Sequence, residues 1–308
     1  MRPERGCMTL SVTNTVEQRS MEPLAPLAGD ARALVDSLGV ELAGEKIDLP
    51  SFPDVAMRVR KALTSEEVGI EDAVKIVSAE PALAARLMQL SNSVTLNPGG
   101  KRLNNLRAAM ARIGLNMACS VTIAFAMSQL RRAETYKGIE IRLGKLWHEA
   151  AHLAAVSRVI ARRFTTLNAD TALLAGLLQC VGKLYLMTRA ARFPKLLADD
   201  AALERIIAEY HLRVARAILR NWDMDTEIVQ AIAACGELTR EHAGASDLTD
   251  VLVASAALIA LGPDAKPDEI AFPGMPAARR LGLDSAACSV ALAESRDEIQ
   301  ALRQALNV

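Results

Sequence analysis

The chain has 308 residues, enough to bury a sizeable core as one large domain or two smaller ones. Lysine plus arginine and aspartate plus glutamate number 36 each, so no global charge favours nucleic acid or an anionic membrane as a partner. The arginine doublets at 131–132, 162–163 and 279–280 are isolated, and we expect them on solvated helix faces or helix ends. Apolar residues make up 51% of the chain and aromatic residues only 3%, which favours helix over sheet.

The cysteines and the apolar runs indicate a cytoplasmic protein. The five cysteines are scattered, without a CxxC pair, as expected of reduced thiols: Cys7, Cys119, Cys180, Cys235 and Cys288. The start of the chain is polar and charged, and no apolar signal-peptide core follows it. The longest apolar run, 251–261, is too short to span a bilayer and contains Ser255. We therefore expect no membrane partner.

In chain order, the first half predicts a leader followed by short helices. Residues 1–44 are expected to form a flexible leader with a short helix near 31–42, ended by Gly44. Ser51 is a plausible N-cap for the first packed helix, with Val55, Val59 and Leu63 at helical spacing. Further helices are expected over 70–79, from Pro81 onward, over 105–113 and over 117–130, the last two separated by Gly114.

The second half predicts longer helices. One is expected around 143–164, and Asn168 is a good N-cap for the next, which would carry Gln179 and Cys180. Apolar stripes predict helices over 203–218, 228–234 and 248–261. A proline-containing linker then runs through Pro267, Pro273 and Pro276. Asp284 can cap a terminal helix whose apolar residues would dock on the bundle or pair with a second copy: Val290, Ile299, Leu302 and Leu306. No alternating strand pattern occurs, so the fold class is all-α.

One segment has the pattern of a metal enzyme without its metal ligands. Residues 173–184 read LLAGLLQCVGKL and resemble the Ala-Gly-Leu-Leu-His-Asp-Ile-Gly-Lys stretch of HD-superfamily phosphohydrolases. Gln179 and Cys180 stand where that His-Asp pair would be. A hydrolase needs the pair, because its carboxylate and imidazole hold the cations that activate water. The resemblance therefore implies that the scaffold remains without the chemistry.

The resemblance becomes more specific over residues 45–262, where the chain looks like an HDOD protein, a member of the HD-related output domain family. The segments that carry it, in the family's order, are 49–56 (LPSFPDVA), 79–87 (AEPALAARL), 90–93 (LSNS), 109–115 (AMARIGL), 146–147 (LW) and 175–178 (AGLL). The resemblance implies a two-lobed helical bundle. It consists of an N-terminal lobe (45–140) and a degenerate HD-like lobe (141–262), followed by the linker and terminal helix (263–308).

The other metal positions of the superfamily have also lost their ligands. The Leu146-Trp147 match places Glu149 at the first histidine, the final aspartate falls on Ser255, and a His-His segment would fall near Cys235. An amide, a hydroxyl and a thiol are poor ligands for hard cations, and Glu149 alone cannot hold two of them. We expect no catalytic residue, no metal and no cofactor. The residues of the former site are expected to line a degenerate cleft: Glu149, His152, Gln179, Cys180 and Ser255.

Two other site chemistries were weighed. His152, His211, Cys180 and Glu149 could form an unrelated zinc site, and His148 is spaced i, i+4 from His152. No HExxH string supports this, and the helix with Cys180 contributes no histidine. Cys180 as a nucleophile would lie in an apolar run without an obvious base, so a buried inert thiol is favoured.

The family resemblance implies a non-catalytic bacterial signalling module. We expect an adaptor that binds another signalling protein, with a homodimer through the terminal helix as one arrangement. Two alternatives stay open: a phosphohydrolase with a degenerate site, and a metal-free nucleotide sensor that uses the former cleft.

Overall fold

The computed structural model describes residues 29–44, 47, 70–93, 96–97, 100–131, 138–260 and 275–306. Over these residues the chain forms helices and turns without a strand, which confirms the all-α fold class. The expected helix that follows Ser51 lies outside the described residues. The helices are α2 (Gly29–Ala43), α4 (Ile70–Ser78), α5 (Pro81–Ser91), α6 (Leu106–Ile113), α7 (Leu115–Arg131), α8 (Glu140–Phe164), α9 (Ala169–Leu178), α10 (Val181–Ala190), α11 (Pro194–Leu197), α12 (Asp200–Asn221), α13 (Thr226–Ala234), α14 (Leu248–Ala260), α15 (Pro276–Arg280), α16 (Ser285–Glu294) and α17 (Arg296–Leu306).

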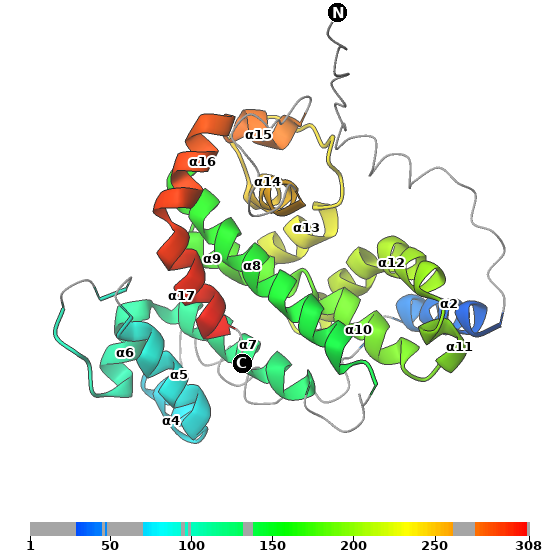
Figure 1. Ribbon diagram of the computed structural model, residues 1–308, viewed down its shortest axis with the longest axis horizontal. Coiled ribbons are helices and arrows are strands. Elements are labelled where there is room, and N and C mark those ends of the chain that lie inside the picture. The colour runs from blue at the N-terminus through cyan, green and yellow to red at the C-terminus, as the bar shows by residue number, and fades with distance from the viewer. Residues whose placement is uncertain are drawn as a thin grey trace, which may run out of the picture.

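The long helix α8 is the centre of the arrangement. Helices α4 to α6 gather at one end of the molecule, and α10 to α12 lie with α2 at the other, as Figure 1 shows. Helices α9, α14 and α17 all pack on α8 (Figure 1). Its apolar side is almost continuous, because Ala151, Ala154, Ala155, Val159 and Ile160 are fully buried. Small side chains on this face allow neighbouring helices to approach closely.

The predicted helix ends are largely confirmed. The Asn168 side chain accepts hydrogen bonds from the backbone N–H groups of Asp170 and Thr171, and so caps α9. Asp284 caps α16 in the same way by accepting from Ala287. Gly114 separates α6 from α7 with a φ of 83°, a conformation that glycine adopts without a steric penalty.

Two glycines of the 173–184 segment are required for helix packing. A Cβ on Gly176 would lie 2.8 Å from the Ala154 Cα on α8. A Cβ on Gly182 would lie 1.9 Å from the His211 carbonyl oxygen and 2.9 Å from the Ala215 nitrogen, both on α12. These close approaches give a physical reason for both glycines that does not involve chemistry.

The short helix expected in the leader is part of the packed structure. Leu34 and Leu38 of α2 are fully buried, and α2 packs on α11 and α12. The Glu41 carboxylate accepts hydrogen bonds from the Tyr185 hydroxyl and the Arg189 guanidinium on α10. Although residues 1–44 were predicted as a leader, its helix belongs to the second half of the bundle.

Two local predictions of helix extent were wrong. Gln179 and Cys180 do not lie inside a helix, because α9 ends at Leu178 and α10 begins at Val181. The single terminal helix is broken at Ser295 into α16 and α17.

Two further details at the C-terminal end correct the prediction. Ile299, Leu302 and Leu306 dock as expected, but Val290 is 56% exposed and does not. Pro276 does not lie in a linker but is buried at the first turn of α15, where its missing N–H leaves no bond unmade.

Among the described residues, one helical stretch is long and apolar enough to cross a membrane by length and composition, Ala169–Ala190, which corresponds to α9 and α10. Leu106–Ile113 and Leu115–Ala126 pass the same test only as a pair that is bent by 108°. In the structure 83% of the most apolar window of Ala169–Ala190 is buried inside the bundle. This burial is what a core helix of a globular protein shows.

Candidate functional site

The α9–α10 junction holds the residues that replace the His-Asp pair. Gln179 closes α9 and Cys180 precedes α10. The Gln179 Nε2 donates a hydrogen bond to the Cys235 Sγ at 2.9 Å, and Cys235 closes α13. The structure therefore brings together the two positions at which the superfamily resemblance places the His-Asp pair and the His-His segment.

Both thiols of the junction are engaged within their own helices. The Cys180 Sγ donates to the Leu177 carbonyl at 3.2 Å, and the Cys235 Sγ donates to the Ile232 carbonyl at 3.1 Å. Burial raises the pKa of Cys180 to about 12 and that of Cys235 to about 11, although Lys183 opposes the shift in both. At physiological pH the thiols are protonated, and a protonated thiol is a poor nucleophile and a poor metal ligand.

Lys183 and His211 border the same junction from α10 and α12. The His211 Nδ1 lies 2.7 Å from the Ile207 carbonyl oxygen, its helical neighbour one turn earlier. Burial, and then the charge of Lys183, lower the pKa of His211. The junction thus combines an amide, two neutral thiols, a neutral imidazole and one ammonium group, and lacks a carboxylate among its described contacts.

The other three residues of the predicted cleft lie elsewhere along α8 and α14. Ser255 is fully buried, and its hydroxyl donates to the Val251 carbonyl at 2.7 Å. Glu149 is exposed and lies 4.0 Å from Lys145. The His152 Nδ1 on α8 is buried without a hydrogen-bond partner in the described protein, and burial, followed by the charge of Arg303 on α17, lowers the pKa of this imidazole. Among the described contacts, no hydrogen bond or ion pair joins these three residues to Gln179 or Cys180.

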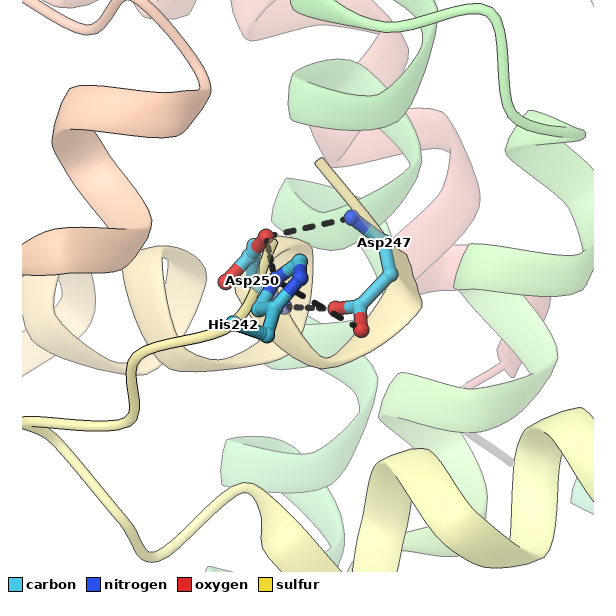
Figure 2. Close-up of side chains that lie close together, drawn as sticks. All are labelled: His242, Asp247 and Asp250. Atoms are coloured by element: carbon cyan, nitrogen blue, oxygen red, sulfur yellow. Dashed lines mark hydrogen bonds and ion pairs between the residues drawn. The ribbon is translucent and has the colours of Figure 1, made fainter. Parts of the chain in front are cut away.

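A different group of ligand-type residues was missed by sequence reasoning. His242, Asp247 and Asp250 have ligand atoms that all lie within 4.8 Å of one another, and Figure 2 shows the three side chains converging at the start of α14. The His242 Nε2 lies 3.0 Å from the Asp250 Oδ2. Asp247 and Asp250 each accept a hydrogen bond from the other's backbone N–H, at 3.0 and 3.1 Å, which makes a reciprocal cap for α14 (Figure 2).

Each of these two carboxylates is hydrogen-bonded through both of its oxygens to one arginine. Arg280 of α15 donates to both oxygens of Asp250, at 2.6 and 3.0 Å. Arg240 donates to both oxygens of Asp247, at 2.6 and 3.1 Å. We call these four residues, with His242, the Asp250 clasp. Burial alone would raise the pKa of Asp250, but the hydrogen bonds from Arg280, Asp247 and His242 outweigh it and hold the pKa below its ordinary value.

The Asp250 clasp therefore joins α14 to α15 as a structural unit. Asp250 is 1% exposed, and a cation at this point would have to displace a guanidinium that makes a bidentate contact. Arg279 and Arg280 lie in the last turn of α15, so the predicted placement of this doublet at a helix end is confirmed, although the Arg280 side chain is only 10% exposed. The sequence contains the Asp-x-x-Asp spacing of a reciprocal cap, but nothing local indicates that α15 supplies the counterion.

The zinc site weighed from the sequence is not assembled in the described part of the chain. There, the one group of three or more histidine, cysteine or acidic residues close enough to share an ion is His242, Asp247 and Asp250. His148 is exposed, and its Nδ1 lies 2.8 Å from the Gly144 carbonyl oxygen in its own helix.

Comparison with known proteins agrees with this architecture. The family model of the HDOD domain matches residues 49–237. The chain belongs to the HDOD family. A solved HDOD domain protein of unknown function from Geobacter sulfurreducens is 20% identical, with a TM-score of 0.62 over 87% of this chain and 99% of that one.

Two other solved structures share the fold. A protein from Shewanella amazonensis SB2B with the provisional name of metal-dependent phosphohydrolase is 22% identical, with a TM-score of 0.68 over 90% of this HDOD chain and 99% of that chain. One from Marinobacter aquaeolei VT8, provisionally named a signal transduction protein, is 18% identical, with a TM-score of 0.61 over 91% and 67%. An uncharacterized protein of Treponema pallidum is 20% identical over 212 residues, and this match spans 63% of the HDOD chain but only 39% of that relative.

Proposed function

We propose that this HDOD protein is a non-catalytic adaptor in bacterial signal transduction that acts by binding another signalling protein in the cytoplasm. The observation that carries the proposal is the Gln179–Cys235 hydrogen bond at the α9–α10 junction. Where a hydrolase of the superfamily would need carboxylate and imidazole ligands, this chain has an amide and two neutral thiols that bond to each other or to their own helices.

The family match and the fold support a signalling role. The HDOD model covers both ends of the bundle, and one neighbour with the same fold bears the name of a signal transduction protein. A helical bundle suits an adaptor, because its surfaces can present helices and grooves to a partner.

The alternative of a degenerate phosphohydrolase is motivated by the provisional name of the Shewanella protein. It requires bound metal, since hydrolysis of this class uses cations to activate water. Metal content and phosphate release should be measured together on the purified protein, with and without a chelator. The adaptor proposal expects sub-stoichiometric metal and no chelator-sensitive hydrolysis. Stoichiometric metal with hydrolysis that the chelator abolishes would replace the adaptor by an enzyme.

The nucleotide sensor is separated from the adaptor by thermal shift. A ligand that binds only the native state must raise the unfolding temperature, so no shift at saturating nucleotide is the expected result. A reproducible rise would favour the sensor. The adaptor itself is tested by pull-down from the native host across growth conditions, and failure to find a specific partner would contradict it.

A further inference from the structure

The C-terminal helix α17 lies on α8 and also contacts α5 and α7, so it joins the central helix to the end of the molecule formed by α4 to α6 (Figure 1). Its apolar side inserts Ile299, Leu302 and Leu306 into the bundle, all at most 9% exposed. At its end, the Trp147 Nε1 of α8 donates a hydrogen bond to the Leu306 carbonyl at 3.0 Å. The family's Leu-Trp position therefore serves here as part of the seat for a helix.

A buried acidic residue anchors α17 at its other end. Glu298 is 5% exposed, and its two carboxylate oxygens accept from the guanidinium groups of Arg158 and Arg162 on α8. Arg158 is also held by Asp170 at 2.8 Å, so it stays in place whether or not α17 is docked. The anchor therefore selects a helix with an acidic residue, because an uncharged one would leave Arg162 without this counterion and the mostly buried Arg158 with Asp170 alone.

Between these two contacts the fit is poor. The His152 Nδ1 on α8 and the Arg303 Nε on α17 are both buried, and neither has a hydrogen-bond partner within the described protein. Both residues lie between the Trp147–Leu306 hydrogen bond and the Glu298 ion pairs on the packed helices α8 and α17. Burial, and then the charge of Arg303, lower the pKa of His152. A buried polar group without a partner forfeits the hydrogen bonds that it makes with water in the unfolded chain, so this mismatch weakens the docking of α17.

We propose that the seat of α17 on α8, formed by Trp147, His152, Arg158 and Arg162, is the surface on which the HDOD protein binds its partner, and that α17 is a displaceable resident. The partner supplies an amphipathic helix with the pattern of α17: an acidic residue in place of Glu298 and apolar residues in place of Ile299, Leu302 and Leu306. It differs at the position of Arg303, where it carries a carboxylate that bonds to His152. This inference deepens the adaptor proposal and rests on it.

A second copy of this chain is the weaker occupant. Its α17 carries the same Arg303 and so makes the same mismatch with His152. The chain's own α17 is also covalently attached, and attachment raises its effective concentration to the millimolar range. A helix from a partner displaces α17 only if it binds the seat more tightly than α17 does. The mismatch between Arg303 and His152 is the contact at which a partner helix gains affinity over α17.

The test uses labelled peptides of residues 294–306 added to the full-length protein, with binding followed by fluorescence anisotropy. The peptide with Arg303→Glu is expected to bind at least about ten-fold more tightly than the native-sequence peptide, because it replaces a buried group without a partner by a carboxylate that accepts a hydrogen bond from His152. A matched control with Arg303→Glu and Glu298→Gln is expected to lose about ten-fold or more, because it leaves Arg158 and Arg162 without their acid. Equal affinity of all three peptides would overturn the proposal.

The same change in the intact chain gives a second, independent measurement. Arg303→Glu in the full-length protein is expected to raise the unfolding temperature and to weaken binding of the Arg303→Glu peptide about ten-fold, because the resident helix now fits its seat. No rise and no weakening would contradict the mismatch. A wild-type dimer that is lost on substitution of Leu302 would show that a second copy is the occupant, and would also overturn the proposal.

Pull-down separates a failure of this inference from a failure of the adaptor function. A host partner captured by the wild-type chain and lost with Arg303→Glu supports both. A partner captured equally by both chains leaves the adaptor in place and overturns the α17 seat as its surface. Capture of no partner by either chain contradicts the adaptor and, with it, the inference.

Discussion

The α9–α10 junction and the Asp250 clasp differ in whether their residue types are suited to binding a metal ion. The superfamily resemblance places a His-Asp pair at the junction, but this chain has Gln179 and Cys180 there, and their side chains bond to Cys235 and to the helix backbone. The clasp has histidine and two aspartates within ligand distance of one another, yet Arg240 and Arg280 neutralise them.

In both regions, the partners of a polar side chain decide its role more than its residue type does. A carboxylate has about four lone-pair sites, and those of Asp250 already receive Arg280 twice, the Asp247 N–H and His242. A cysteine with a pKa near 12 is a small apolar side chain for most purposes. The junction thus serves helix packing, of α9 on α8 and of α10 on α12, whereas the clasp attaches α15 to α14 through charged groups.

The largest effect is expected from Gly182→Ala at the junction. Its Cβ would lie 1.9 Å from the His211 carbonyl oxygen, and a backbone atom cannot move aside as a side chain can. Separation of α10 from α12 should reduce the free energy of unfolding by about 3 kcal/mol or more, measured by urea denaturation. Gly39→Ala is the control, because an added Cβ there meets nothing within 4 Å in the middle of α2. It should be neutral or stabilise by up to about 1 kcal/mol.

Asp250→Ala in the clasp should have the next largest effect. It leaves the buried Arg280 without its main counterion, and loss of one partner of a buried pair reduces the free energy of unfolding by about 3 kcal/mol. Glu241→Ala is the matched control, since Glu241 is 61% exposed and also pairs with Arg280. It should cost less than about 1 kcal/mol. Equal losses for the two variants would contradict the structural role of the clasp.

The pH dependence of stability should separate the two regions. The pKa of His211 is lowered from 6.5, so the unfolded chain takes up the proton first and the stability from neutral His211 is lost as pH falls below about 6.5. The pKa of Asp250 is lowered from 3.8, so the stability from its ionised form is lost only as pH falls below about 3.8. Unfolding should be measured between these values, where His211→Gln should flatten the pH profile and Asp250→Asn should not.

The smallest effect is expected from metal removal. If neither the junction nor the clasp holds an ion, a chelator should change the unfolding temperature by no more than about 1 °C, and added zinc, manganese or magnesium should do no more. Differential scanning fluorimetry is sufficient. A larger shift that Asp250→Ala abolishes would identify the clasp as a metal site and reverse its interpretation.

Much of the fold follows from local sequence. Asn168, Asp284 and Gly114 mark helix ends through the chemistry of their own side chains and backbone, and the structure places the ends there. The break at Ser295 was not predicted, because the apolar spacing continues across it from one helix to the next. The exposed Val290 shows that periodicity alone does not say which part of a stripe meets a neighbour.

The helical class, the family and the lack of hard-metal ligand types at positions 179 and 180 could be predicted from the sequence alone. Residue type and short-range spacing are sufficient for each of them. The three-dimensional packing was needed to show that Gln179 bonds to Cys235 and that Arg280 pairs with Asp250. It also shows that α17 packs on α8, where Trp147 bonds to Leu306. These contacts join residues from 30 to more than 150 positions apart. Helix packing sets such pairs, and no local pattern in the chain records which face meets which.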